Sequence, residues 1–313
     1  MPDTLSRRLA EFEGAEAALV LASDMAATAC TILALLRPGD HLLASRGVRQ
    51  STRRFLEQEL PALGVAVTFI DPQDTRGWRR GIERTTRALL LETPSLEEAR
   101  FVDCQPPRAL ARELGIALLV DSTAASPVLL RPIRHGADVV LHDASFLLDG
   151  AGGYAAGVVC GSEGLVEEVR AKMQVWGAVP HPHALVALER GLETLDVRVR
   201  RQSATAFTLA AWAVEHPAIT QVDFPTIPEG VERDTEGTQA PVVGITLRLT
   251  LASAQHAIHS ASRFLEHGDS RPAPWPGTYT TLAEPVPGTS ALRLQVGLEA
   301  PDLLIERLTE ALA

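Results

Sequence analysis

The sequence has a single lysine, Lys172, among 313 residues, so all its other long cationic side chains are arginines. Against 29 basic residues stand 39 acidic ones, which gives a formal net charge of −10. A charge of this sign repels phosphate backbones and anionic lipid, so we expect neither nucleic acid nor membrane surfaces among the partners. The preference for arginine over lysine suggests a GC-rich bacterial gene.

Cysteine is scarce too, with three residues. Cys30, Cys104 and Cys160 are too few and too scattered for a disulfide framework or a zinc cluster. Cys30 and Cys160 lie in apolar segments, as small core residues do. This cysteine usage is typical of a reducing compartment, and we predict a cytoplasmic protein.

No hydrophobic run is suited to crossing a membrane. The most apolar stretch, residues 17–36, carries Asp24 near its middle, and a carboxylate at a bilayer centre costs on the order of 3 kcal/mol. A buried strand followed by a helix explains this stretch better. The polar start of the sequence, MPDTLSRRLAEFEG, does not resemble a signal peptide.

Short apolar runs alternate with helix-length segments over the first two thirds of the sequence. Several runs lack polar alternation, as expected of strands that are buried on both faces of a mostly parallel sheet. We predict an α/β fold with seven strands: AALVLA, HLLAS, AVTFI, RALLLE, IALLVD, DVVLH and AAGVVC. Polar residues follow or end many of these strands, and ligands of open α/β sheets bind at that edge.

The remainder predicts a smaller C-terminal α/β domain. Apolar residues recur at helical spacing over residues 182–216, which indicates long helices that leave the first domain. A strand over 242–251, a helix over 253–267, a strand over 291–299 and a last helix over 302–313 are expected to follow a loop rich in Pro, Gly and Glu. We place the large domain at residues 1–195 and the C-terminal domain, with its linking helices, at residues 196–313.

The order of these segments resembles a known family. The stretches that carry the resemblance are EFEGAEAALVLASDMAA, LLRPGDHLLAS, LETPSL, LLVDSTAASPVLLRPIRHGADVVLHDAS, GGYAAGVVCG, ERGLETLDVRVRRQ and ALRLQVGLE. They closely resemble the Cys/Met-metabolism family of enzymes that use pyridoxal 5′-phosphate (PLP), which includes cystathionine γ-synthase, cystathionine γ-lyase and methionine γ-lyase. The resemblance implies the fold type I aminotransferase-like architecture and, usually, a homotetramer built from dimers.

The resemblance places a different residue where the family has its Schiff-base lysine. That lysine follows a short Ser-Ala-Thr-like stretch, which corresponds here to residues 142–145, and Phe146 stands at the lysine position. A phenyl ring has no amine to form an imine, so the family's covalent chemistry cannot start there. Lys172 lies in a charged helical segment, where a solvated surface lysine is the simpler interpretation.

The position of the family's phosphate cup is altered as well. The family has a small Ser-Gly-Met turn at a helix N-terminus, whose amides hold the phosphate, and this sequence has Ser23, Asp24 and Met25. We expect Asp24 to cap those amides itself. Asp143 stands where a small hydroxyl residue would contact the phosphate, so two carboxylates would face a dianion.

Contacts to the cofactor ring are also replaced. The family tyrosine that stacks on the pyridine ring aligns with Val48, and the asparagine that contacts the ring hydroxyl aligns with Leu96. The aliphatic side chain of Val48 cannot stack on the ring as tyrosine does, and that of Leu96 cannot bond the ring hydroxyl as asparagine does.

Two family positions keep their residue types. Asp121 matches the aspartate that pairs with the pyridine nitrogen, and Arg293 matches the arginine that binds the substrate α-carboxylate. Each also has a structural interpretation. Asp121 can cap the loop after its strand, and Arg293 can pair with a carboxylate such as Glu92 or Asp121.

Other candidate sites are weaker. Ser145, His142 and Asp143 contain the residue types of a catalytic triad, but adjacent residues at a strand end point in different directions. His181 and His183 alternate as metal ligands do, yet no third ligand is near them in sequence, and we predict no metal site.

A cluster of arginines follows the second strand: Arg46, Arg49, Arg53 and Arg54. A solvated helix face explains most of it. Our sharper hypothesis concerns Arg49, which stands beside the position of the ring-stacking tyrosine. We predict that Arg49 folds into the vacated cleft and pairs with Asp24 or Asp143.

Two functions follow from these observations. The first is a family member that has lost PLP chemistry, for which we expect no cofactor. It would act as a binding, assembly or regulatory subunit, with a second copy of itself or an active relative as its partner. The second is an enzyme that holds PLP, pyridoxamine phosphate or a preformed adduct noncovalently. It would use His142 as a base for C–S elimination or γ-replacement on a sulfur amino acid or a specialised metabolite.

Overall fold

Seven strands between Ala17 and Gly161 form one sheet in the order β1-β7-β6-β5-β4-β2-β3. Our computed structural model describes residues 2–227, 244–266 and 279–313. Neighbours from β3 to β6 are parallel, whereas β7 runs antiparallel to both β1 and β6. The strands are β1 (Ala17–Leu21), β2 (His41–Ser45), β3 (Ala66–Ile70), β4 (Thr86–Glu92), β5 (Ala117–Asp121), β6 (Val139–Asp143) and β7 (Gly157–Gly161). The predicted seven-stranded, mostly parallel sheet is confirmed.

Helices cover both faces of this sheet, which explains why its strands are apolar without alternation. Along β5, Leu118 and Val120 belong to one apolar cluster and Leu119 to the other. The first face carries α1 (Pro2–Glu13), α5 (Thr75–Arg80), α6 (Gln105–Leu114) and α7 (Ser126–Leu129). The second carries α2 (Asp24–Leu35), α8 (Glu163–Trp176) and the run α3 (Gln50–Arg54), η1 (Phe55–Glu59) and α4 (Leu60–Ala62).

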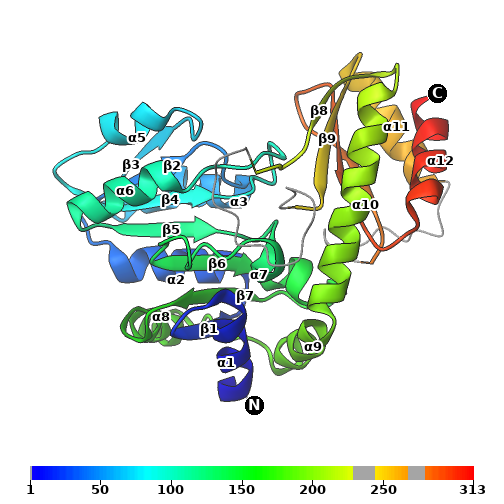
Figure 1. Cartoon of the computed structure of the whole chain (residues 1–313). Coiled ribbons are helices and arrows are strands. Elements are labelled where there is room, and N and C mark those ends of the chain that lie inside the picture. Colours follow the sequence, from blue (N-terminus) through cyan, green and yellow to red (C-terminus); the bar gives the residue numbers. More distant parts are fainter. Residues whose placement is uncertain (1, 228–243, 267–278) are drawn as a thin grey trace.

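Two long helices lead into the C-terminal domain, as predicted: α9 (Pro182–Glu193) and α10 (Leu195–Glu215). Figure 1 shows α10 running from the large sheet to the smaller domain. Its first turns pack in the large core through Leu195 and Val199, and its second half packs in a separate core through Ala206 and Leu209. The predicted domain boundary after residue 195 therefore falls at the start of a helix that both cores share.

The smaller domain is a four-stranded antiparallel sheet in the order β10-β11-β9-β8. Its elements are β8 (Ile219–Asp223), β9 (Thr246–Leu251), α11 (Ala254–Glu266), β10 (Leu282–Pro285), β11 (Ala291–Gln295) and α12 (Pro301–Leu312). The sequence predicted β9, α11, β11 and α12 but neither edge strand. Residues 242, 243 and 267 of the predicted strand and helix lie outside the described residues.

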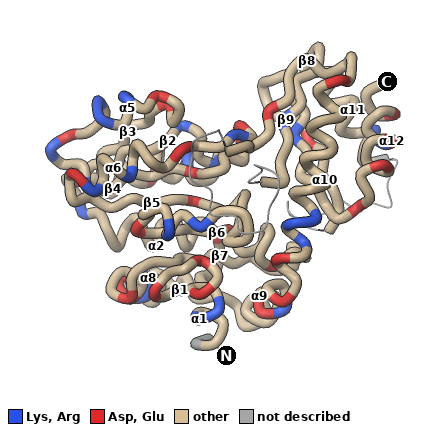
Figure 2. The backbone as a smooth tube through the Cα atoms, in the orientation of Figure 1, with Lys and Arg blue, Asp and Glu red and all other residues tan. Residues whose placement is uncertain are grey.

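Acidic and basic residues are interspersed along the outer elements of both domains, as Figure 2 shows. In α8 the acidic residues come first and Arg170 and Lys172 follow them, whereas in α10 three arginines lie between Asp196 and Glu215. Among the helices that the structure describes, none is long and apolar enough to cross a membrane.

Candidate functional site

Three carboxylates meet at one edge of the large sheet because parallel strands end on the same side. Glu92 is the last residue of β4 and lies directly beside Asp121, the last residue of β5. Asp121 in turn pairs with Leu141 of β6, so Asp143 at the end of that strand lies two residues further along. The alternation of side chains along a strand puts all three carboxylates on the face covered by α2.

A fourth carboxylate comes from the start of α2. Ser23 is the N-cap of this helix, and its Oγ accepts a hydrogen bond from the amide of Ala26 at 3.1 Å. The expectation that Asp24 caps the helix is therefore wrong. Because Ser23 supplies the cap, the side chain of Asp24 can turn toward the sheet edge, where its Oδ1 accepts a hydrogen bond from the guanidinium of Arg49.

Arg49 places its guanidinium among these four side chains. Its Nη2 lies 2.7 Å from Oδ1 of Asp24 and 2.5 Å from Oδ2 of Asp121. Its Nη1 lies 3.4 Å from Oδ2 of Asp143, and its Nε lies 3.6 Å from Oε2 of Glu92. The backbone amide of Arg49 donates to the same Glu92 oxygen at 2.9 Å. We call Asp24, Glu92, Asp121 and Asp143 the carboxylate cradle.

The cradle is largely closed to solvent. The Arg49 side chain is 12% exposed, and that of Glu92 only 1%. Burial, and after it the nearby Asp121, raise the pKa of Glu92 to about 8 against the opposing effect of Arg49. Burial also raises the pKa of Asp24 to about 6 and that of Asp143 above its ordinary value. Burial by itself would lower the pKa of Arg49, but the four carboxylates together raise it well above the ordinary value.

Thr123 fixes two members of the cradle, and the sequence analysis missed it. Its amide and its hydroxyl both donate to Oδ1 of Asp121, at 3.0 and 2.6 Å. The same hydroxyl accepts a hydrogen bond from the amide of Asp143 at 2.8 Å. The Asp-Ser-Thr sequence directly after β5 is the signal that could have predicted this turn. The structural interpretation of Asp121, as the residue that caps the loop after its strand, is confirmed.

The hypothesis for Arg49 is confirmed, and the structure extends it. The guanidinium pairs with Asp24 and Asp143, as predicted, and also with Asp121 and Glu92, which the sequence analysis did not foresee. The neighbouring arginines stay outside the cluster. Arg53 lies near Glu57 on the helix surface, and Arg54 donates to Gln58.

His142 does not face the cradle, although it precedes Asp143. Its Nε2 lies 2.8 Å from Oε2 of Glu13 in α1, and both side chains are buried on the opposite face of the sheet. Ser145 donates its hydroxyl to Asp143, at the start of η2 (Ala144–Leu148). The proposed role of His142 as a base in the pocket is therefore wrong, and the three residues do not form a triad.

The aliphatic and aromatic replacements lie in the cores. Phe146 is 2% exposed and belongs to the same apolar cluster as Leu188 and Leu192 of α9. Leu96 is in that cluster too, and only its amide faces the cradle, donating to Oε1 of Glu92 at 2.8 Å. Val48, the other replaced position, is buried in the second core. Met25, which the family turn shares, contacts the hydroxyl of Thr52 through its sulfur on the same side.

Lys172 cannot replace the missing amine from where it lies. It is in α8, which packs against α2 and β1, and it lowers the pKa of the Cys30 thiol, whose burial raises that pKa more strongly. Cys30 belongs to the middle of α2, whereas the cradle meets only the first residue of that helix. The lysine is thus a partly exposed residue between two helices.

Arg293 is already paired with carboxylates. Its Nε and Nη2 lie 2.9 and 2.7 Å from Oε1 of Glu284, and its Nη1 lies 3.1 Å from Oε2 of Glu97. The prediction that Arg293 pairs with a carboxylate is confirmed, but its partners are Glu284 and Glu97 and not Glu92 or Asp121. Because Glu97 belongs to the large domain, this arginine connects the two domains.

His181 and His183 stay at the surface. His181 is the N-cap of α9, and its Nδ1 accepts the amide of His183. Their rings lie 5.0 Å apart beside Tyr154. Within residues 2–227, 244–266 and 279–313, no group of three His, Cys, Asp or Glu side chains is arranged to hold a metal ion.

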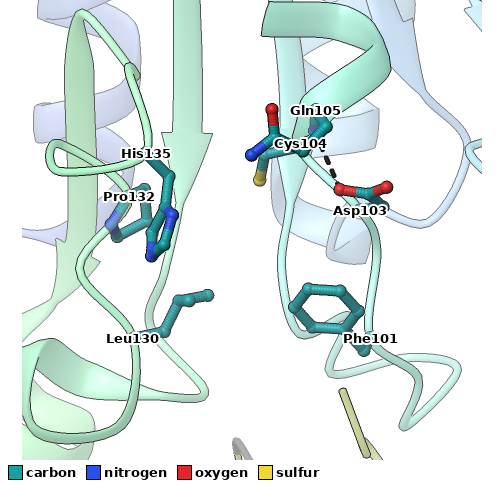
Figure 3. A pocket seen from close by; sticks show the side chains of 7 residues that line it. All are labelled: Phe101, Asp103, Cys104, Gln105, Leu130, Pro132 and His135. Atoms are coloured by element: carbon teal, nitrogen blue, oxygen red, sulfur yellow. Dashed lines mark hydrogen bonds between the residues drawn. The ribbon is translucent and has the colours of Figure 1, made fainter. Parts of the chain in front are cut away.

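A small pocket, separate from the cradle, lies between two loops of the large domain. Figure 3 shows Phe101, Cys104 and Gln105 on one side and Leu130, Pro132 and His135 on the other. Burial raises the pKa of the Cys104 thiol to about 12, so the thiol is protonated at neutral pH and is a poor nucleophile.

The mostly parallel seven-stranded sheet and the small antiparallel domain together form the fold type I architecture of PLP-dependent enzymes. The chain belongs to the Cys/Met metabolism PLP-dependent enzyme family, whose model matches residues 1–268. The structure is also similar to that of a Campylobacter jejuni protein that is assigned as an O-acetylhomoserine (thiol)-lyase and carries a pyridoxyl-lysine monophosphate group. The TM-score is 0.90 at 24% identity, over 100% of this chain and 85% of the other.

Three relatives are 30–34% identical to this chain over the aligned segments. L-methionine gamma-lyase of Pseudomonas putida is 31% identical over 98% of this chain and 82% of its own length. O-succinylhomoserine sulfhydrylase of Pseudomonas aeruginosa is 30% identical over 99% of this chain and 81% of its own length. Chloroplastic cystathionine gamma-synthase 1 of Arabidopsis thaliana is 34% identical over 74% of this chain, which spans only 41% of that relative.

Proposed function

We propose that this chain is a family member without Schiff-base chemistry, which acts by binding and assembly with a second copy or an active relative. The observation that carries the proposal is the position of Arg49, whose guanidinium lies where three strand ends and the start of α2 converge. A cofactor at this edge would have to displace an arginine that four carboxylates hold. The family depends on PLP and the relatives are named as active enzymes, so this function is a departure within the family.

The residues of the cradle do not fit a PLP molecule. A phosphate dianion near Asp24 and Asp143 would be repelled by both carboxylates in a site that is mostly shielded from water. No amine is in place either, because the only lysine of the chain is in α8 and Phe146 is packed in the core. We therefore derive no reaction step through the cofactor.

Noncovalent catalysis lacks the groups that the sequence offered for it. His142 is paired with Glu13 on the other face of the sheet, so it cannot take a proton in the cleft. Arg293 would have to leave both Glu284 and Glu97 before it could bind a substrate carboxylate. These contacts favour binding over catalysis.

An exposed apolar segment at the end of α8 supports assembly. Val175, Trp176 and Val179 are 81%, 60% and 58% exposed, which is unusual for large apolar side chains that lie so close in sequence. Exposed apolar groups of this kind mark surfaces where proteins associate. The proposed partner is a second copy of the chain or an active member of the family.

The first test is a cofactor-binding experiment. The purified protein is mixed with excess PLP, freed of unbound PLP, and its absorbance spectrum is recorded before and after borohydride. A Lys172→Arg variant serves as the control, since it removes the only lysine that could form an incidental surface imine. We expect no retained chromophore. A chromophore that remains without being fixed by borohydride would instead support the enzyme with noncovalent cofactor.

The second test addresses assembly. Light scattering is measured on the protein alone and mixed with an active cystathionine γ-synthase-like relative. We expect a dimer or larger assembly that Trp176→Glu weakens and that Gln174→Glu, an exposed polar change on the same helix, leaves intact. A monomer that binds no relative would overturn the assembly role.

A further inference from the structure

The carboxylate cradle holds one guanidinium from several directions. Its four members come from α2, β4, β5 and β6, and each has a carboxylate oxygen within 3.6 Å of a guanidinium nitrogen of Arg49. Asp24 and Asp121 share Nη2, whereas Asp143 lies near Nη1 and Glu92 near Nε. A guanidinium is planar and presents a fork of N–H donors, which suits several carboxylates at once. An ammonium group is a point charge and would reach fewer of them.

The charge of the cradle selects the ligand. Without a cation, the aspartates of the cradle (Asp24, Asp121 and Asp143) would repel one another in a site with little access to water, whereas Glu92, with a pKa of about 8, keeps its proton at neutral pH. A cation that enters relieves this repulsion, and an anion such as phosphate adds to it. The cradle is thus suited to a charge opposite to that of the phosphate that the family's cofactor carries.

The Arg49 side chain can be removed without breaking its backbone attachment. Its amide is held by Glu92 independently of the guanidinium, and its side chain makes no capping hydrogen bond to α3. Truncation at Cβ therefore leaves the entry to α3 in place and empties only the space among the carboxylates.

We infer that the carboxylate cradle is a receptor for guanidinium-type cations and that Arg49 is its resident ligand within the chain. Removing the side chain opens a site that takes free guanidinium or an alkylguanidinium and rejects phosphate. This inference builds on the proposed function, because it names the chemical class of group that the altered cleft accepts in place of the cofactor's phosphate.

The test is rescue of a truncated variant. Thermal unfolding of Arg49→Ala is followed with and without about 20 mM guanidinium chloride, a concentration at which denaturation by this ion is negligible. If the dissociation constant is about 1 mM, mass action stabilises the folded variant enough to raise its midpoint by roughly 2–4 °C. Sodium chloride and sodium phosphate at the same ionic strength should give no such rise.

Two controls isolate the cradle. The unmodified protein and Arg54→Ala, which loses an exposed arginine of the helix that follows Arg49, should not respond to guanidinium. Arg49→Ala combined with Asp121→Asn removes one carboxylate from the cradle, so its rescue should need about tenfold more guanidinium. A response that is equal in all variants would mean a general salt effect and would overturn the inference.

The outcome is decisive even if truncation prevents folding. An Arg49→Ala or Arg49→Gln protein that is unfolded alone should regain helical circular dichroism when guanidinium is added, and failure to do so overturns the inference. So does a folded variant that phosphate or PLP stabilises as well as guanidinium does. PLP retention by the unmodified protein would refute the proposed function but not the receptor, and the two failures are therefore distinguishable.

Discussion

His142 and Asp143 are adjacent on β6, yet their side chains leave the sheet on opposite faces. The imidazole of His142 is buried against Glu13 of α1, whereas Asp143 lies near Arg49 on the α2 side. The two-residue period of a strand makes this separation unavoidable. This separation explains why His142 takes no part in the carboxylate cradle, although it is next to Asp143 in sequence. The cradle lies on the α2 side of the sheet, and the His142–Glu13 pair lies on the α1 side.

Replacing Phe146 with lysine should not restore the family's chemistry. Phe146 is 2% exposed in the large core, so Phe146→Lys buries an amine among apolar side chains and should cost about 3–5 kcal/mol of stability. We expect no chromophore that borohydride fixes to residue 146, and a lowered thermal midpoint. Phe146→Leu is the matched control and should lose much less stability. Turnover by the lysine variant would show that the cradle does not exclude the cofactor.

Stability should fall as the pH rises through the titration of Glu92. The pKa of Glu92 is about 8 in the folded protein against 4.5 ordinarily, so between these values the folded state binds the proton that the unfolded state has lost. The free energy of unfolding therefore decreases over this range, by at most about 1.4 kcal/mol per pH unit for one proton. Asp24, with a pKa of about 6 against 3.8, adds a similar decrease at lower pH.

Urea unfolding of Glu92→Gln across pH 5–8 checks this prediction. The variant cannot lose a proton at this position, so we expect a flatter pH profile than that of the unmodified protein. Glu57→Gln, an exposed position outside the cradle, should reproduce the unmodified profile. An unchanged slope in Glu92→Gln would mean that another group controls the pH dependence.

Gly157 should tolerate no side chain. A Cβ on this residue would lie 2.3 Å from the backbone oxygen of Ser23, so alanine must push the start of α2 away from β7. Gly157→Ala should cost about 1–3 kcal/mol and should weaken the contact between Asp24 and Arg49. The measurement is urea unfolding, and the control is Gly153→Ala, where a Cβ meets nothing within 4 Å. Equal stability of the two variants would contradict the prediction.

Asp223 should hold the domains together. Its Oδ1 accepts hydrogen bonds from Nε and Nη2 of Arg100 in the large domain, and its Oδ2 lies 3.6 Å from Nη1 of Arg248 in β9. Asp223 is 6% exposed, so Asp223→Ala leaves two arginines without this partner and should cost about 2–4 kcal/mol. Asp196→Ala, which breaks only the exposed pair with Arg200, should cost less than about 1 kcal/mol. Urea unfolding distinguishes them, and similar losses would contradict the prediction.

The two strands that the sequence analysis missed are both edge strands. β8 reads Ile-Thr-Gln-Val-Asp, and β10 is only four residues long and ends in Pro285. Edge strands face solvent on one side and accept proline, so they lack the continuous apolar run that marks a central strand. The buried strands of the large sheet, by contrast, were all predicted because both of their faces must be apolar.

The sequence by itself determined the fold class, the family and the absence of an amine other than Lys172 among the side chains. These follow from composition, from apolar runs and from collinear motifs, all of which are local. Only the tertiary structure decided which strand-end side chains meet, because that depends on strand register and on which face each residue occupies. It brought Asp24, Glu92, Asp121 and Asp143 around Arg49 and turned His142 away, since mutual repulsion of the carboxylates is relieved by a cation that reaches all four.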